Sequence, residues 1–147
     1  MGSQLDAIVE GIAAQLRTIP ELKAVLTYEP DAPGLFPFVF LDMDGWDHPE
    51  TTTGEMTVGW DIVGYLVTGS VTSKAAEAAK RARLIIPAIL EALGHDLHAH
   101  GAIVDGQVLL TEAARGRRQI GGAWYYARRL TFRAVEMFPY QYAILEV

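Results

Sequence analysis

The 147-residue chain contains no cysteine. Neither a disulfide framework nor a cysteine-based zinc site is therefore possible, and we expect that the protein assembles or acts inside a cell. No run of about 18 or more apolar residues occurs, and the first residues lack a basic segment followed by an apolar one, so we expect neither a membrane span nor a signal peptide. The sequence predicts a soluble protein that is not secreted by the usual route.

Basic side chains are scarce in the first part of the chain. Residues 1–61 hold eleven acidic and two basic side chains, whereas residues 62–147 hold seven acidic and ten basic ones. The net charge is −6, and six of the twelve Lys and Arg lie between Arg115 and Arg133. An acidic chain is a poor nucleic-acid coat, because affinity for DNA comes mainly from phosphate neutralisation. A molecule with an acidic and a basic region is, however, suited to docking against copies of itself or against unlike neighbours.

Hydrophobic residues make up 50% of the sequence, which is enough for one core, and we expect one domain over residues 1–147. Apolar residues at helical spacing predict amphipathic helices over residues 5–18 and 74–93. Apolar or alternating stretches predict strands, which cover residues 24–28, 38–43, 55–67, 103–110 and 124–137. We interpret the polar stretches 44–54 and 112–122 as loops.

The element order α-β-β-β-α-β-β indicates an α+β fold, in which a mostly antiparallel sheet of four to five strands packs against two helices. Gly59 and Gly64 are expected to mark bends or bulges in their strand. Seven residues of the sheet are expected to be buried beneath the helices: Phe38, Phe40, Met56, Trp60, Ile62, Leu130 and Phe132.

The stretch FPFVFLDMDGWD (residues 36–47) ends an apolar strand in Asp-x-Asp-Gly, as phosphotransferases of the haloacid dehalogenase superfamily do. There the first Asp attacks phosphorus, and the second works as acid and base beside Mg²⁺. Three short-linked strands in succession instead predict antiparallel pairing, whereas that superfamily has a parallel sheet. Trp46 also stands where the superfamily usually has Thr. We therefore interpret Asp42, Asp44 and Asp47 as parts of a strand end and a turn.

The histidines of GHDLHAHG are the best metal candidates in the chain. His95, His98 and His100 could share one ion, because a His-x-His pair on a strand places both imidazoles on one face. A polar loop after a helix would carry the same residues without a metal, since His is favoured near a helix C-terminus.

Asp42, Asp44 and Asp47 could hold Ca²⁺, but position 53 is Thr where the loop would need a bidentate Glu. We expect no metal and no cofactor. The sequence also has no Ser-His-Asp set, phosphate-binding loop or dinucleotide fingerprint, so we expect that the protein is not an enzyme.

Arg115, Arg117 and Arg118, separated by Gly116 and followed by Gly121-Gly122, predict a mobile basic loop. It could serve solubility alone. It could also be an arm that reaches an acidic surface on a neighbour or DNA passing close by, since Arg pairs bidentately with carboxylate and phosphate. The interface candidates are the basic residues Arg115, Arg117, Arg118 and Arg128 and the acidic residues Asp44, Asp47 and Glu50.

In its order of patterns the chain resembles the tail terminator proteins of long-tailed bacteriophages, also called tail completion or minor tail proteins of the neck. The likeness covers nearly the whole chain and is one of pattern, because the family has no strict catalytic or binding motif. The segments that carry it are LDAIVEGIAAQL, the Pro-rich loop into PFVFLDM, EMTVGWDIVGYLV, KAAEAAKRARLIIPAILEAL and AWYYARRLTFRAVEM.

The resemblance implies an α+β subunit that forms a ring, typically a hexamer, on the last ring of the major tail tube protein. Such a ring ends tube polymerisation and presents a surface to the head completion or stopper protein. Phage DNA would pass through its lumen without specific binding, and no membrane would be involved. The implied location is the neck of the virion, and the host cytoplasm during assembly.

Three alternatives stay open. Another neck protein, a stopper or an adaptor, would share ring assembly. A small metal-dependent hydrolase would use His95, His98 and His100. A dimeric regulatory or binding module would need neither a ring nor a metal.

Overall fold

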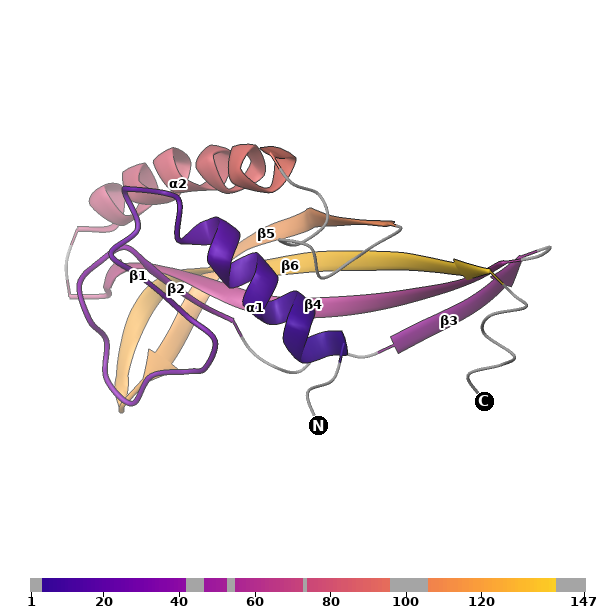
Figure 1. Ribbon diagram of the computed structural model, residues 1–147. Helices are drawn as coiled ribbons and strands as arrows, with labels where there is room; N and C mark the ends of the chain where they lie inside the picture. Colours follow the sequence, from indigo (N-terminus) through magenta and orange to yellow (C-terminus); the bar gives the residue numbers. More distant parts are fainter. Residues whose placement is uncertain (1–3, 42–46, 53–54, 73, 96–105, 140–147) are drawn as a thin grey trace.

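Figure 1 shows the computed structural model, which describes residues 4–41, 47–52, 55–72, 74–95 and 106–139. The α+β class predicted from the sequence is confirmed, because a mostly antiparallel sheet packs against two helices. The elements in chain order are α1 (Gln4–Leu16), β1 (Ala24–Leu26), β2 (Phe38–Leu41), β3 (Asp47–Thr52), β4 (Glu55–Ser70), α2 (Ala75–His95), β5 (Gly106–Ile120) and β6 (Ala123–Pro139).

The sheet has the strand order β1-β2-β4-β6-β5, and β3 also pairs with β4. β2 and β3 share one edge of β4, where β2 lies opposite residues 64–67 and β3 lies opposite residues 55–60. All pairs are antiparallel except β1 with β2, which are parallel. The expectation that consecutive short-linked strands are antiparallel is therefore wrong for β1 and β2, because residues 27–37 run back along the sheet before β2 begins.

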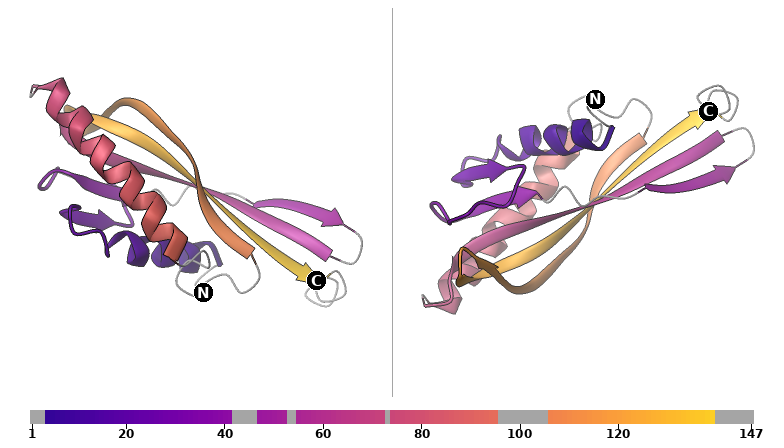
Figure 2. Two further views of the ribbon diagram at one scale, coloured as in Figure 1. Left: turned by 90° about the horizontal axis from the view of Figure 1, so that it is seen from above. Right: turned by 90° about the horizontal axis from the view of Figure 1, so that it is seen from below.

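The main core lies between the two helices and one face of the sheet. The apolar stripe of α1 is fully buried at Ile8, Ile12 and Leu16, because these residues recur at helical spacing. α2 adds Ile85 and Ile89 to the same core. Figure 2 shows α2 crossing over the sheet, with α1 beside it. In the part of the chain that the structure describes, no helix is long and apolar enough to cross a membrane.

A second, smaller core lies on the sheet face away from the helices. Val39 and Leu41 of β2 belong to the main core, whereas Phe38 and Phe40 belong to the second one together with Tyr125. Phe38 and Phe40 are buried as predicted, but their predicted place beneath the helices is wrong, because successive side chains of a strand point to opposite faces. The same prediction is confirmed for the four residues of β4 and β6 whose burial is described: Trp60, Ile62, Leu130 and Phe132. The side chain of Met56 lies outside the described part.

Gly59 and Gly64 do not mark bulges. The register shift of β4 lies between Val67 and Gly69, and both glycines pair regularly with β6. A Cβ atom on Gly64 would lie 2.8 Å from Leu41 Cδ2, and one on Gly59 would lie 2.6 Å from an Arg133 Nη2 atom. The two glycines therefore let side chains of neighbouring strands pass close to the backbone of β4.

The long strands continue beyond the helices as an arm, which we define as β3 together with residues 55–59 of β4 and 135–139 of β6. Figures 1 and 2 show this arm projecting from the part of the sheet that the helices cover. The prediction of a loop over residues 44–54 is wrong for residues 47–52, because each of the six residues of β3 has a partner on β4. The sequence DHPETT has little strand propensity, so the pairing itself determines this strand.

Candidate functional site

The basic segment is a strand and not a loop. β5 continues to Ile120, β6 begins at Ala123, and the two are joined by a two-residue turn. Gly121 and Gly122 both have positive φ, +58° and +87°, which glycine adopts without steric cost. The prediction of a mobile loop over residues 112–122 is therefore wrong, because pairing with β6 outweighs the polar composition of this stretch.

Strand alternation separates the three neighbouring arginines. Arg115 and Arg117 lie on the sheet face that α2 covers, where both line a cavity with residues of that helix. Arg118 lies on the other face, where it contacts Tyr65 and Phe40 of the second core. The sequence grouped these arginines in one flexible segment, whereas the fold gives them two different environments.

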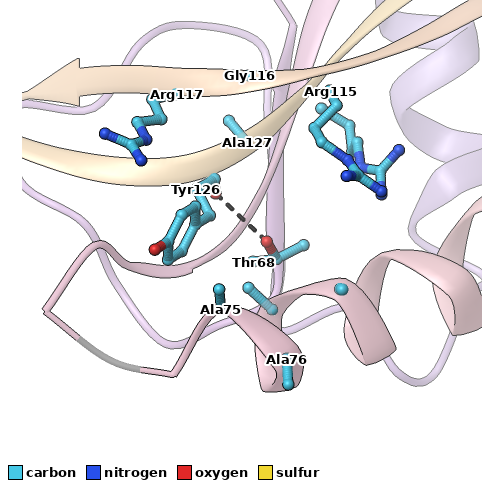
Figure 3. A pocket seen from close by; sticks show the side chains of 11 residues that line it. Thr68, Ala75, Ala76, Arg115, Gly116, Arg117, Tyr126 and Ala127 are labelled. Carbon is cyan, nitrogen blue, oxygen red and sulfur yellow. Dashed lines mark hydrogen bonds between the residues drawn. The ribbon is translucent and has the colours of Figure 1, made fainter.

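The cavity has a volume of about 610 Å³ and lies between the first turns of α2 and strands β5 and β6 (Figure 3). It exists because the first half of α2 carries alanines there, whereas larger residues such as Ile85 and Ile89 fill the space farther along the helix. The lining residues are Thr68, Ala75, Ala76, Ala78, Ala79, Arg115, Gly116, Arg117, Tyr126, Ala127 and Arg128.

Two like charges lie opposite each other in the wall of this cavity. Arg115 on β5 and Arg128 on β6 are direct cross-strand partners. Burial, and after it the positive charge of Arg115, lowers the pKa of Arg128 below its ordinary value. Among the residues that the structure describes, no carboxylate forms an ion pair with Arg115, Arg117 or Arg128. Within the described ranges, therefore, no carboxylate compensates the positive charge at this position.

Contacts with neighbouring groups hold the other polar residues around the cavity in place. The guanidinium of Arg117 lies 5.7 Å from the centre of the Tyr126 ring, its cross-strand partner. The Thr68 hydroxyl donates a hydrogen bond to the Tyr126 carbonyl at 3.3 Å, drawn as a dashed line in Figure 3. Arg81 of α2 donates to the Thr68 carbonyl at 2.7 Å, which ties the helix to the irregular part of β4.

Arg118 holds two parts of the fold together through its side-chain contacts. Its guanidinium donates to Glu29 through Nε at 3.1 Å, forms an ion pair with the same carboxylate through Nη2 at 3.0 Å, and lies 4.4 Å from the centre of the Tyr65 ring. Nη1 also donates to the Tyr65 hydroxyl at 3.3 Å. These contacts connect β5 to the segment that follows β1, on the face opposite the cavity.

Two of the acidic interface candidates lie in the arm, distant from this cavity along the sheet. Asp47 and Glu50 are the first and fourth residues of β3, in the arm, and their side chains are not described. Asp42 and Asp44 lie outside the described residues. In Figure 1 the arm and the turn between β5 and β6 are at opposite ends of the sheet.

The histidine cluster is only partly within the described residues. His95 is the last residue of α2, and its Nε2 lies 3.9 Å from Glu91 Oε1, with both side chains exposed. His98 and His100 lie outside the described part. Across the described ranges, no group of three or more His, Cys, Asp or Glu side chains could hold a metal ion.

The sequence reasoning missed Thr68, Tyr126 and the alanines of α2. One signal could have located the arginine pair. A Gly-Gly dipeptide between two strand-like runs predicts a two-residue hairpin turn. Counting back from Gly121 and forward from Gly122 places Arg115 opposite Arg128, as the structure does.

Comparison with known proteins gives no family for the chain. No protein-family model matches it, and no curated protein matches it at a significant level.

Proposed function

We propose that the chain is a structural subunit of the tail-terminator type, which assembles into a ring on the tail tube of a long-tailed bacteriophage and presents the surface to which the head is joined. The observation that carries the proposal is the arm. A three-stranded piece of sheet about 20 Å long, at about 3.3 Å per residue, projects from a domain whose helices cover only the rest of the sheet.

Such an arm favours contact with another subunit. Sheets in stable domains bury at least one face against another layer, and narrow uncovered ribbons are marginally stable in water. Among the residues that the structure describes, no helix covers the arm, and a neighbouring subunit can supply this layer. Pro49 lies within β3, at the outer edge of the arm, and proline cannot donate a ladder hydrogen bond. The contact should therefore use a face of the arm and not a continuous sheet between subunits.

Charge supports a head-to-tail arrangement. β3 carries Asp47 and Glu50 at one end of the sheet, and the arginines of β5 and β6 lie toward the other end. A contact between unlike surfaces is heterologous, and it closes into a ring when the rotation between neighbours divides a full turn. Complementary charges of this kind mainly steer association and are screened by salt.

The proposal is tested by assembly measurements. Sedimentation velocity and native mass spectrometry over a range of concentrations should show a closed oligomer, expected to be a hexamer, and electron microscopy should show rings. With tail tube protein from the same phage, the protein should bind at tube ends and stop elongation. Rings that never bind tube ends would favour a different neck protein. A chain that stays monomeric or dimeric both free and with tubes would contradict the proposal.

A further inference from the structure

The two arginines that face each other at the cavity do not stabilise the sheet by their pairing. Like charges that face each other directly across two strands destabilise the sheet. Arg115, which is exposed, and Arg128, which is half-buried, nevertheless occupy such a pair beside the first turns of α2. Arg118, by contrast, has a carboxylate partner at 3.0 Å. The arginine pair at the cavity is therefore suited to bind a negatively charged ligand.

We propose that Arg115 and Arg128 form a binding site for a phosphate group, held in the cavity between α2 and the β5–β6 hairpin. Two guanidinium groups offer paired N–H donors to the oxygens of one tetrahedral anion, and each such charge-assisted pair is stronger than a neutral hydrogen bond. A dianion neutralises both arginines, whereas a single carboxylate neutralises one. The observations thus favour phosphate over an acidic side chain.

The cavity has room for more than a phosphate ion. Its volume of about 610 Å³ is within the range of small-molecule sites, roughly 300 to 1,000 Å³. The Tyr126 ring and Arg117 form a wall next to the arginine pair, as Figure 3 shows for Arg117, Tyr126 and Arg115. The first turn of α2 contributes the positive end of the helix dipole to the same space. The ligand class is therefore a phosphate ester: either a small-molecule monoester, whose dianion neutralises both arginines, or two successive phosphodiesters of a nucleic-acid backbone, each of which carries one negative charge.

Binding is measured by isothermal titration calorimetry on the full chain, with inorganic phosphate and with pyrophosphate. Sodium chloride keeps the ionic strength constant, so that general screening does not change. The variants are Arg115→Gln and Arg128→Gln, which retain much of the side-chain length. The matched control is Arg129→Gln, because Arg129 is the exposed neighbour of Arg128 on the opposite face of β6.

The wild-type protein and Arg129→Gln should bind phosphate saturably with the same Kd. Each of the other two variants should bind at least about tenfold more weakly, the loss expected for about 1.4 kcal/mol of binding energy. Equal Kd values in all four proteins, or no saturable binding to the wild-type protein, would overturn the inference. Circular dichroism of each variant shows whether it is folded before it is compared.

A second arm of the experiment distinguishes the two sources of phosphate. A short single-stranded DNA oligonucleotide is titrated into the same four proteins, with and without pyrophosphate. Competition by pyrophosphate, together with weaker oligonucleotide binding in Arg115→Gln and Arg128→Gln, would assign the site to backbone phosphate. Oligonucleotide binding that is absent, or the same in all four proteins, leaves the free phosphate ester as the ligand, provided that phosphate itself binds. Because monomers suffice for both titrations, the result does not depend on ring assembly.

Discussion

Arg118 of β5 forms an ion pair with Glu29, with 3.0 Å between Arg118 Nη2 and Glu29 Oε1, on the sheet face away from the helices. The two residues are 89 positions apart in the sequence. The arginine also lies 4.4 Å from the centre of the Tyr65 ring. This single side chain therefore fixes the edge strand against the segment that follows β1.

Replacement of Arg118 by Ala should lower the free energy of unfolding by about 1–2 kcal/mol, from a partly exposed ion pair and a cation–π contact. Urea unfolding measures this change. The control is Arg117→Ala, because Arg117 is an exposed neighbour on the other face, and its replacement should cost less. A double-mutant cycle with Glu29→Gln isolates the ion pair. Additive effects in that cycle would show that Glu29 and Arg118 do not stabilise each other.

The turn between β5 and β6 predicts a difference between two adjacent glycines. Both have positive φ, so alanine is strained at either position. A Cβ atom on Gly121 would also overlap the Asp31 carbonyl oxygen, whereas one on Gly122 would meet open space.

Gly121→Ala should therefore lower the free energy of unfolding by about 1–3 kcal/mol more than Gly122→Ala does, and its melting temperature should be correspondingly lower. Differential scanning calorimetry of both variants provides the comparison. Equal losses would mean that the segment around Asp31 does not pack against the turn.

The opposed arginines predict that a charge-removing change stabilises the protein. In a chloride buffer of low ionic strength, Arg115→Gln should raise the free energy of unfolding by about 0.2–1 kcal/mol, because it removes a like-charge cross-strand pair. The gain should shrink in about 1 M NaCl, where charges are screened within about 3 Å. Arg129→Gln should lack this gain. A loss of stability in Arg115→Gln would contradict the repulsion that the cross-strand geometry implies.

The elements that could be predicted from the sequence are those whose own side chains form a core. The stripe of α1 and the alternation of β4 and β6 are hydrophobic patterns, and each predicts which face is buried. β3 and the second half of β5 carry no such pattern. They form strands because the long strands β4 and β6 offer them backbone groups to pair with. The length of a partner strand cannot be predicted from the residues of the outer strand.

Of the residues that line the candidate site, only three arginines were among the interface candidates chosen from the sequence. The sequence placed Arg115, Arg117, Arg118 and Arg128 at an interface, and the structure places three of them around one cavity. Arg118 lies on the other face of the sheet because successive side chains of a strand alternate. The sequence predicted a loop here, and a loop has no such alternation. The cavity itself depends on the alanines of α2 facing β5 and β6, a tertiary relationship that the helical pattern does not contain.

The final prediction concerns the arm. Replacing residues 49–58 with Asn-Gly keeps His48 opposite Gly59 and joins them by a two-residue turn of a type that suits a hairpin. The main core is retained, because Trp60, Ile62 and the helices are unchanged. The shortened protein should therefore unfold cooperatively, with circular dichroism close to that of the wild-type protein.

Assembly, in contrast, should be lost, because the neighbouring subunit no longer has the arm to cover. Sedimentation should show a monomer at concentrations where the wild-type protein forms rings, and tail tubes assembled with the shortened protein should exceed their normal length. The control is Glu77→Gln, at the exposed start of α2 and outside the arm, which should assemble normally. Normal rings and normal tube length with a shortened arm would show that subunits meet through another surface. The charged ends of the sheet would then be the next surfaces to vary, because steering by unlike charges does not require the arm to lie across its neighbour.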